Sequence, residues 1–184
     1  SMAGYKDSLD IEAKGEAIVF DWLRNLGCTV IFNRNDHRGK EFQTYGDLIV
    51  RPPEQSKHML VELKVEKSGR HGNFFIETWS NRTWFTPGWI FTSKAQRLLY
   101  YFLEDDCLYS MCMDDLKSFV FQRNKDNRIT AFFHYPEKTQ SKYNQPNQTH
   151  GLCVPINDLL HSVPVKQYQP KAELAKRTLI SEVA

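Results

Sequence analysis

Charged residues lie inside two apolar, β-branched runs of this chain, and that pattern limits how the chain can fold. The runs are 46–50 and 60–65, and they contain Asp47, Glu62 and Lys64. Burying a charge is costly, so a strand rarely contains one unless a counter-charge or a metal ion lies beside it. Because Glu62 and Lys64 are two residues apart, they point to the same face of a strand. We therefore expect two neighbouring strands that gather these charges on one face.

These residue types suit a site for a hard divalent cation. Mg²⁺ typically takes one or two carboxylates together with waters and substrate phosphate. Asp47 and Glu62 would supply the carboxylates, and the backbone carbonyl of Leu63 would add an oxygen. Lys64 would orient or deprotonate the attacking water, or neutralise the charge of the transition state. For the first role we expect a depressed pKa of Lys64, since it is partly desolvated near a metal.

The order Asp47, then Glu62-Leu63-Lys64 after a short turn, resembles the PD-(D/E)XK nuclease superfamily, with Gly46 where the motif has proline. The resemblance implies a restriction-endonuclease-like mixed β-sheet flanked by helices. It also implies Mg²⁺ or Mn²⁺ as cofactor and hydrolysis of phosphodiester bonds in DNA. Asp47, Glu62 and Lys64 would be the catalytic residues.

A second part of the resemblance lies in the preceding helix. Residues 14–17, Lys-Gly-Glu-Ala, are similar to the opening helix of archaeal Holliday-junction resolvases of that superfamily. This match implies that Glu16 is a further catalytic residue and a metal or water ligand, whereas Glu12, one turn earlier, is less suitable. The resemblance covers roughly residues 11–66.

The fold class expected from the order of elements is α/β (α+β). Apolar periodicity predicts helices and strands. The predicted helices are 9–26, 94–104 (capped by Ser93), 114–121, 156–160 and 171–183. The predicted strands are 29–32, 45–51, 58–66, 73–78, 89–91, 108–113, 129–133 and 152–155. The strands 45–51, 58–66 and 73–78 are predicted to form an antiparallel meander, and 33–41 and 136–149 are predicted to be loops.

Charge divides the chain unevenly. Residues 1–116 carry 14 Lys and Arg and 17 Asp and Glu, whereas residues 117–184 carry 10 and 5, so the C-terminal part is basic. We expect residues 1–4 to be a tag remnant and residues 5–184 to be a single nuclease domain. Within it, 5–104 would be the catalytic core and 105–184 a basic C-terminal extension.

Basic side chains near the predicted site or in the basic part are candidates for contacts with DNA phosphates. They are Arg34, Arg38, Lys40, Lys94, Arg123, Lys125 and Arg128. Lys94 is included because it begins a predicted helix, where backbone amides favour anions. Aromatic residues crowd the segment 79–89. They either stack on bases or form a small core under the loop, and the sequence leaves both readings open.

The sequence also makes several function classes less suitable. No apolar run is long enough to span a membrane, and no signal peptide opens the chain, so we expect a cytoplasmic, nucleoid-associated protein of a bacterial or phage-infected cell. His150 and Cys153 lack a second pair for a zinc site.

The expected function is a metal-dependent DNA endonuclease that is structure-selective or nonspecific, of a phage, mobile-element or recombination and repair type, and homodimeric by analogy. The alternatives are a non-catalytic nucleic-acid-binding or assembly module on the same fold and a nuclease that acts on RNA.

Overall fold

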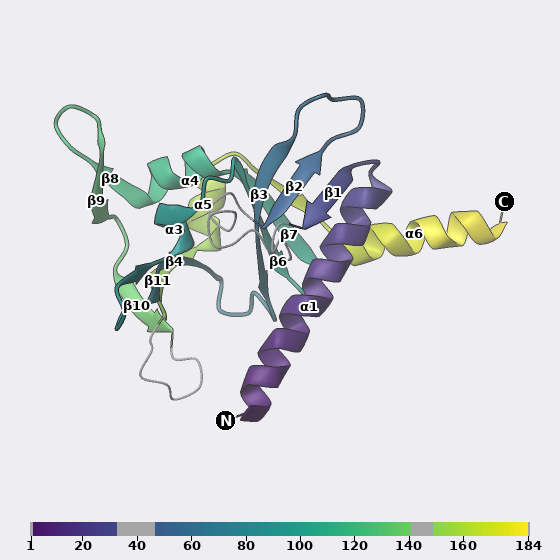
Figure 1. Cartoon of the computed structure of the whole chain (residues 1–184), viewed down its shortest axis with the longest axis horizontal. Helices are drawn as coiled ribbons and strands as arrows, with labels where there is room; N and C mark the ends of the chain where they lie inside the picture. The colour runs from purple at the N-terminus through teal and green to yellow at the C-terminus, as the bar shows by residue number, and fades with distance from the viewer. Residues whose placement is uncertain (1, 33–46, 141–148, 184) are drawn as a thin grey trace.

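The computed structural model describes residues 2–32, 47–140 and 149–183. Within them the chain forms a mixed α+β fold in which a large mixed sheet is flanked by helices (Figure 1). The helices are α1 (Met2–Asn25), α3 (Trp89–Thr92), α4 (Met113–Val120), α5 (Ile156–Ser162) and α6 (Pro170–Val183). The predicted fold class is therefore confirmed.

Three sheets contain all the described strands. The main sheet has the strand order β1-β2-β3-β6-β7-β12, the second has the order β10-β11-β4-β5, and β8 pairs with β9 alone. The strands of the main sheet are β1 (Thr29–Phe32), β2 (Leu48–Arg51), β3 (Met59–Glu66), β6 (Arg97–Phe102), β7 (Cys107–Cys112) and β12 (Val165–Tyr168). The others are β4 (Asn73–Asn81), β5 (Thr86–Pro87), β8 (Phe121–Arg123), β9 (Ile129–Phe133), β10 (Glu137–Gln140) and β11 (Thr149–Pro155).

Helix α1 packs on the main sheet through an apolar stripe. Val19, Trp22 and Leu23 are buried at helical spacing. Gly15 lies on the same stripe, where a Cβ would approach the Cγ1 atom of Val65 to 2.3 Å, so only a glycine lets the helix come this close to β3. The predicted end at Gly27 is confirmed, since this residue has a φ of 87°. The helix begins earlier than predicted, at Met2.

Strand β3 lies between an antiparallel and a parallel neighbour. It pairs antiparallel with β2 and parallel with β6. The prediction of a helix over 94–104 is wrong, because β6 occupies most of that range. Both faces of β6 are buried: Leu98 and Tyr100 contribute to one core, and Leu99 to the other. A short run that is apolar on both faces has no period by which a buried strand differs from a buried helix.

The predicted meander is also wrong at its third strand. Strand β4 leaves the main sheet and pairs with β11, with Ile76 opposite Leu152. The partner strand is far away in the sequence, so local patterning gave no sign of it. Two further predictions fail: 89–91 is helix α3 rather than a strand, and the predicted loop 136–149 contains β10. The predicted loop 33–41 lies outside the described residues.

Two hydrophobic cores lie on opposite faces of the main sheet. One joins α1 to β2 and β3 and contains Val19, Leu48, Val61 and Leu63. The other joins β6 and β7 to the second sheet and to α3, α4 and α5. Strands β7 and β12, from residues 105–184, belong to the main sheet. The predicted division of the domain at residue 104 therefore passes through this sheet.

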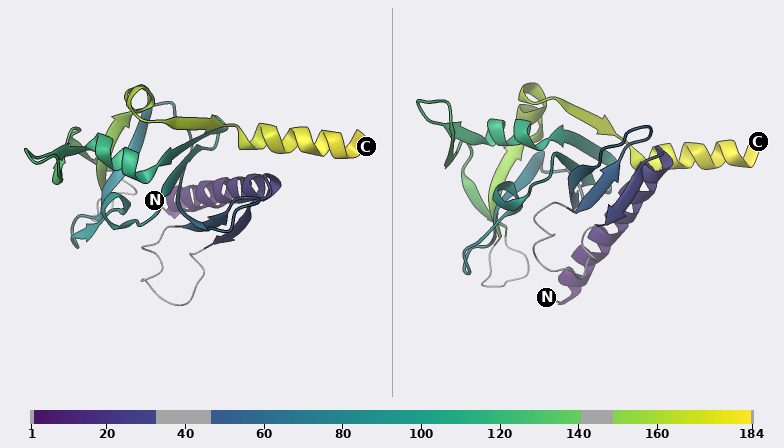
Figure 2. Two further views of the ribbon diagram at one scale, coloured as in Figure 1. Left: turned by 90° about the horizontal axis from the view of Figure 1, so that it is seen from above. Right: turned by 45° about the horizontal axis from the view of Figure 1, so that its top comes forward.

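Two elements project from opposite sides of the molecule. Helix α6 projects on one side and the β8–β9 hairpin on the other, in all views (Figure 1, Figure 2). Among the described helices none combines the length and the apolar character that crossing a membrane requires.

Candidate functional site

Asp47 and Glu62 face each other across β2 and β3. Leu48 pairs with Val61 in antiparallel register, so the next step of the same register places Asp47 opposite Glu62. The backbone N–H of Leu63 donates to Oδ2 of Asp47 at 2.9 Å, which fixes this carboxylate against β3. Glu62 is 6% exposed, and its neighbours Val61 and Leu63 point to the α1 core instead. The two carboxylates therefore share the face of the sheet opposite α1.

Lys64 lies on that same face. Its Nζ atom is 3.4 Å from Oε1 of Glu62, and its side chain is 30% exposed. The ammonium also lies 5.6 Å from the ring centroid of Trp89, within the range of a cation–π contact. The chain thus brings Asp47, Glu62 and Lys64 together as the alternation of the strand predicts.

The pKa of the Glu62 carboxyl is raised. Burial is the main cause, and the nearby negative charge of Asp47 adds to it. The Lys64 ammonium and the Ser93 hydroxyl act in the opposite direction but do not cancel the effect. Two carboxylates in a poorly hydrated place thus repel each other, and a cation between them would relieve that repulsion.

The pKa of Lys64 is raised by the acidic side chains around it, and the depressed pKa expected beside a bound metal stays a prediction. Burial by itself lowers the pKa of Lys64, but the negative charges of Glu62, Asp47 and Glu77 together outweigh it. Lys64 is therefore an ammonium at neutral pH. This charge suits stabilisation of a phosphorane-like transition state better than removal of a proton from water.

Helix α3 contributes two contacts that the sequence reasoning missed. The Oγ–H of Ser93 donates to Oε2 of Glu62 at 3.0 Å, and Oγ of Ser93 accepts the backbone N–H of Ala95 at 3.2 Å. Ser93 was predicted to cap a helix, whereas it follows α3 and orients a site carboxylate. Trp89 of α3 supplies the ring beside Lys64. Between β3 and α3 the chain passes through β4 and β5 of the second sheet. The sequence spacing between Glu62 and Ser93 therefore gave no sign that the two side chains meet.

Glu16 lies on α1, which covers the other face of β3. Gly15 touches the Val65 side chain there, and Glu16 is half-buried beside that contact. In the part of the chain that the structure describes, no three His, Cys, Asp or Glu side chains cluster closely enough to hold a metal ion. The role of Glu16 as a third ligand therefore stays a prediction, and His150 and Cys153 belong to no described zinc cluster.

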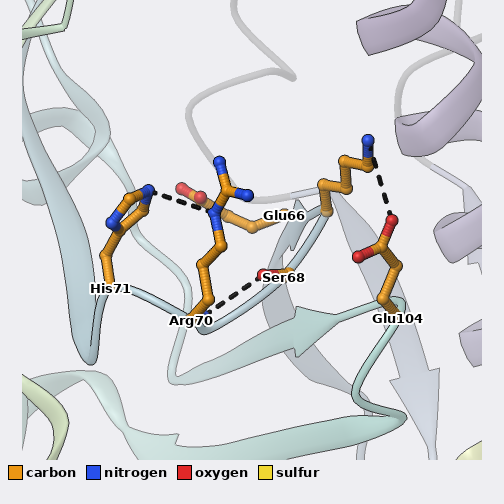
Figure 3. A pocket seen from close by; sticks show the side chains of 6 residues that line it. Glu66, Ser68, Arg70, His71 and Glu104 are labelled. Carbon is orange, nitrogen blue, oxygen red and sulfur yellow. Dashed lines mark hydrogen bonds and ion pairs between the residues drawn. The ribbon is translucent and has the colours of Figure 1, made fainter.

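A charged pocket lies at the end of β3, two residues beyond Lys64 on the same face. It has a volume of about 220 Å³ and is lined by Glu66, Lys67, Ser68, Arg70, His71 and Glu104 (Figure 3). Nε–H of Arg70 donates to Nε2 of His71 at 3.4 Å, and Lys67 pairs with Glu104 at 3.7 Å. The row of charged side chains on β3 therefore continues into a partly basic recess, which the sequence reasoning did not single out.

The predicted phosphate-binding residues fall into three groups. Arg34, Arg38 and Lys40 lie outside the described residues. Lys94 is exposed between α3 and β6, so the helix start that favoured it does not exist.

The third group is on the β8–β9 hairpin, where Arg123, Lys125 and Arg128 are all exposed. Arg123 donates to the carbonyl oxygen of Asn127 and to Oγ of Ser118, so it stabilises the hairpin itself. Among the described residues, the side chains of Lys125 and Arg128 form no hydrogen bond or ion pair. They remain the stronger candidates for contact with phosphate.

The aromatic segment divides between the two readings that the sequence left open. Trp89 is buried in the core beside the second sheet. Trp84 and Phe85 are 72% and 69% exposed at the turn between β4 and β5. The segment is therefore part core and part exposed surface.

Comparisons of this chain with protein-family models, with curated proteins and with solved structures found no match.

Proposed function

We propose that this chain is a metal-dependent DNA endonuclease of the PD-(D/E)XK type, which hydrolyses phosphodiester bonds with Mg²⁺ or Mn²⁺. One observation carries the proposal. Asp47, which immediately precedes β2, lies opposite Glu62 of β3, and an ion pair holds Lys64 on the same face. An acid pair that could hold a metal ion, with an ammonium beside it, is a charge arrangement suited to metal-assisted phosphodiester hydrolysis.

The residues present fit a divalent cation. Hard cations of this kind often use one or two protein carboxylates, the other positions being filled by water and phosphate oxygens. The raised pKa of Glu62 supports such a site, because burial and the charge of Asp47 disfavour the charged carboxylate and a bound cation would offset both effects. A bound cation would supply positive charge at the scissile phosphate and activate a water molecule.

The side chains around the cation position would have separate roles. Asp47 and Glu62 would be the metal ligands, with the Leu63 carbonyl and Glu16 as further candidates. The N–H of Leu63 and the hydroxyl of Ser93 hold the two carboxylates in place. Lys64 would place its positive charge beside the phosphate as negative charge develops there.

The nucleic-acid substrate would bind across the charged face. Lys125 and Arg128 on the projecting β8–β9 hairpin are suited to backbone phosphates, which carry no sequence information. The candidate contacts are to backbone phosphates rather than to base edges, and this favours structure-selective or nonspecific cleavage. A homodimer would cut both strands, and sedimentation of the protein alone would test that part of the proposal.

The test is cleavage of four DNA forms: supercoiled plasmid, linear duplex, single strand and a four-way junction. Each would be incubated with Mg²⁺, with Mn²⁺ and with chelator. We expect cleavage that depends on metal and is lost in Glu62→Gln, while Glu54→Gln, a change in the exposed turn before β3, cuts like the parent. Metal-independent cleavage, or none of any substrate, would contradict the proposal.

The non-catalytic alternative predicts a different result in the same assay. A binding or assembly module would retain the basic hairpin, bind DNA and cut none of the four forms. A matched RNA single strand and duplex separate deoxyribonuclease from ribonuclease activity. The choice among the three functions is therefore made by one set of substrates.

A further inference from the structure

The turn between β4 and β5 displays two aromatic rings in a defined conformation. The backbone N–H of Trp84 donates to Oδ1 of Asn81 at 3.0 Å, and that of Phe85 donates to the carbonyl oxygen of Arg82 at 3.3 Å. Phe85 has a φ of 51°, which is uncommon for a residue with a bulky side chain. Such strain is retained where the surroundings impose it, and it clusters at functional places.

A cation accompanies the rings. The guanidinium of Arg82 lies 4.6 Å from the ring centroid of Trp79 and 5.1 Å from that of Phe85. These two rings meet edge to face at 6.3 Å. Residues 82–85 contain no acidic side chain. The tip therefore combines aromatic faces with positive charge, and this is the chemistry with which proteins bind unpaired bases and their phosphates.

The tip is joined firmly to the candidate site. The N–H of Gly88 donates to the carbonyl oxygen of Thr78 at 2.8 Å, and a Cβ at Gly88 would lie 2.4 Å from the carbonyl oxygen of Glu77. This close approach fixes the start of α3 against β4. Because α3 carries Trp89, beside Lys64, and is followed by Ser93, which bonds Glu62, the rings and the site belong to one packed segment.

We propose that Trp84 and Phe85 stack on unpaired bases, so that the substrate is DNA with a single-stranded or unpaired stretch beside the cleaved phosphate. The naming of DNA rests on the proposed function, whereas the stacking itself does not require cleavage. In an intact duplex the faces of the bases are covered by their neighbours. A protein ring reaches a base face only where the stack is broken or the strand is single.

The experiment measures binding in chelator, so that nothing is cut. Short labelled oligonucleotides would be used as single strand, as perfect duplex and as duplex with a bulge. The bulged strand also carries 2-aminopurine at the unpaired position, because stacking on a ring quenches its emission. We expect the parent to prefer the bulge and the single strand over the duplex, and to quench the probe.

Variants assign the effect to the rings. Trp84→Ala and Phe85→Ala should each weaken binding to the bulge by about tenfold, and Trp84→Ala should abolish much of the quenching. Trp84→Phe keeps an aromatic ring and should retain both binding to the bulge and quenching. The loss in Trp84→Ala would then come from the missing ring. The control is Ile180→Ala, because Ile180 is an apolar side chain that is 69% exposed on α6, on the opposite side from the β8–β9 hairpin. It should behave like the parent.

Three results would overturn the inference. The first is equal affinity of the parent for bulge and duplex. The second is unchanged binding and quenching in Trp84→Ala. The third is a dimer, seen by sedimentation, that Trp84→Ala dissociates. Failure of the proposed function looks different. In that case no substrate is cut with Mg²⁺, yet ring-dependent quenching persists. Conversely, cleavage that requires Glu62, together with binding and quenching that are unchanged in Trp84→Ala, would leave the nuclease and remove the stacking.

Discussion

The two faces of β3 differ in what their side chains do for the protein. On the α1 face, Val61 and Leu63 are buried in an apolar core, and Gly15 lets the helix approach closely. On the other face, Glu62 and Lys64 are charged, and burial and repulsion raise the pKa of Glu62. One strand thus carries a face that stabilises the fold and a face that is costly in the absence of a ligand. Costly charges of this kind are a sign of function.

The largest effect should come from removing the positive charge on the charged face. Lys64→Ala should lower the rate of DNA cleavage about 10²–10⁴-fold with little loss of DNA affinity, since the ammonium acts mainly in the transition state. Single-turnover cleavage at saturating DNA measures this rate. Lys57→Ala, in the exposed turn before β3, is the matched control. Parent-like cleavage by Lys64→Ala would remove the proposed mechanism.

The next effect belongs to the α1 face and concerns stability. Gly15→Ala should lower the free energy of unfolding by about 1–3 kcal/mol, because the new methyl group overlaps the stiff side chain of Val65. In a Val65→Ala background the same change should be neutral or stabilise the helix by up to about 1 kcal/mol. Urea unfolding of the four proteins measures this coupling. Equal losses in both backgrounds would show that the close approach is not the cause.

A smaller effect of opposite sign is expected on the charged face. A carboxyl with a raised pKa stabilises the fold below its unfolded pKa, and that contribution is lost as pH rises through its folded pKa. At neutral pH without metal, Glu62→Gln should therefore be more stable than the parent. The difference should shrink as the pH falls into the acid range where Glu62 is protonated.

Unfolding in chelator across this pH range tests the sign. Adding Mn²⁺ should reduce the difference in unfolding free energy between Glu62→Gln and the parent at neutral pH, because Mn²⁺ binds and stabilises the parent alone. A Glu62→Gln protein that is less stable than the parent at neutral pH would mean that the carboxylate is a structural group.

The smallest effect on cleavage should come from Glu16, which lies on α1 and so on the other side of β3 from Glu62 and Lys64. If Glu16 reaches around the sheet to the carboxylates, Glu16→Gln should weaken cleavage by about tenfold and leave the thermal melt nearly unchanged. Glu12→Gln, one turn earlier on α1, serves as the comparison. Full activity in Glu16→Gln would confine the site to the charged face.

The sequence correctly predicted those features that depend only on residues close together in the chain. The strand 29–32, the helix end at Gly27 and the common face of Glu62 and Lys64 follow from local spacing. The run at 97–102 was predicted to be part of a helix because Ser93 could cap it and its apolar residues fit helical spacing. It is apolar on both faces, and its parallel partner β3 lies across a long connection. Ser93 and Trp89 were missed as site residues for a similar reason. Tertiary packing, rather than sequence spacing, brings them to Glu62 and Lys64.

A calorimetric titration with Mn²⁺ tests the central claim most directly, namely that the charged face of β3 is a metal site. The titration would be run with and without a short phosphorothioate DNA, because phosphate oxygens complete the coordination of hard cations. We predict binding heat in the parent and in Lys64→Ala, and its loss in Glu62→Gln and in Asp47→Asn. Absence of heat in the parent under both conditions, or equal heat in Glu62→Gln, would contradict the account.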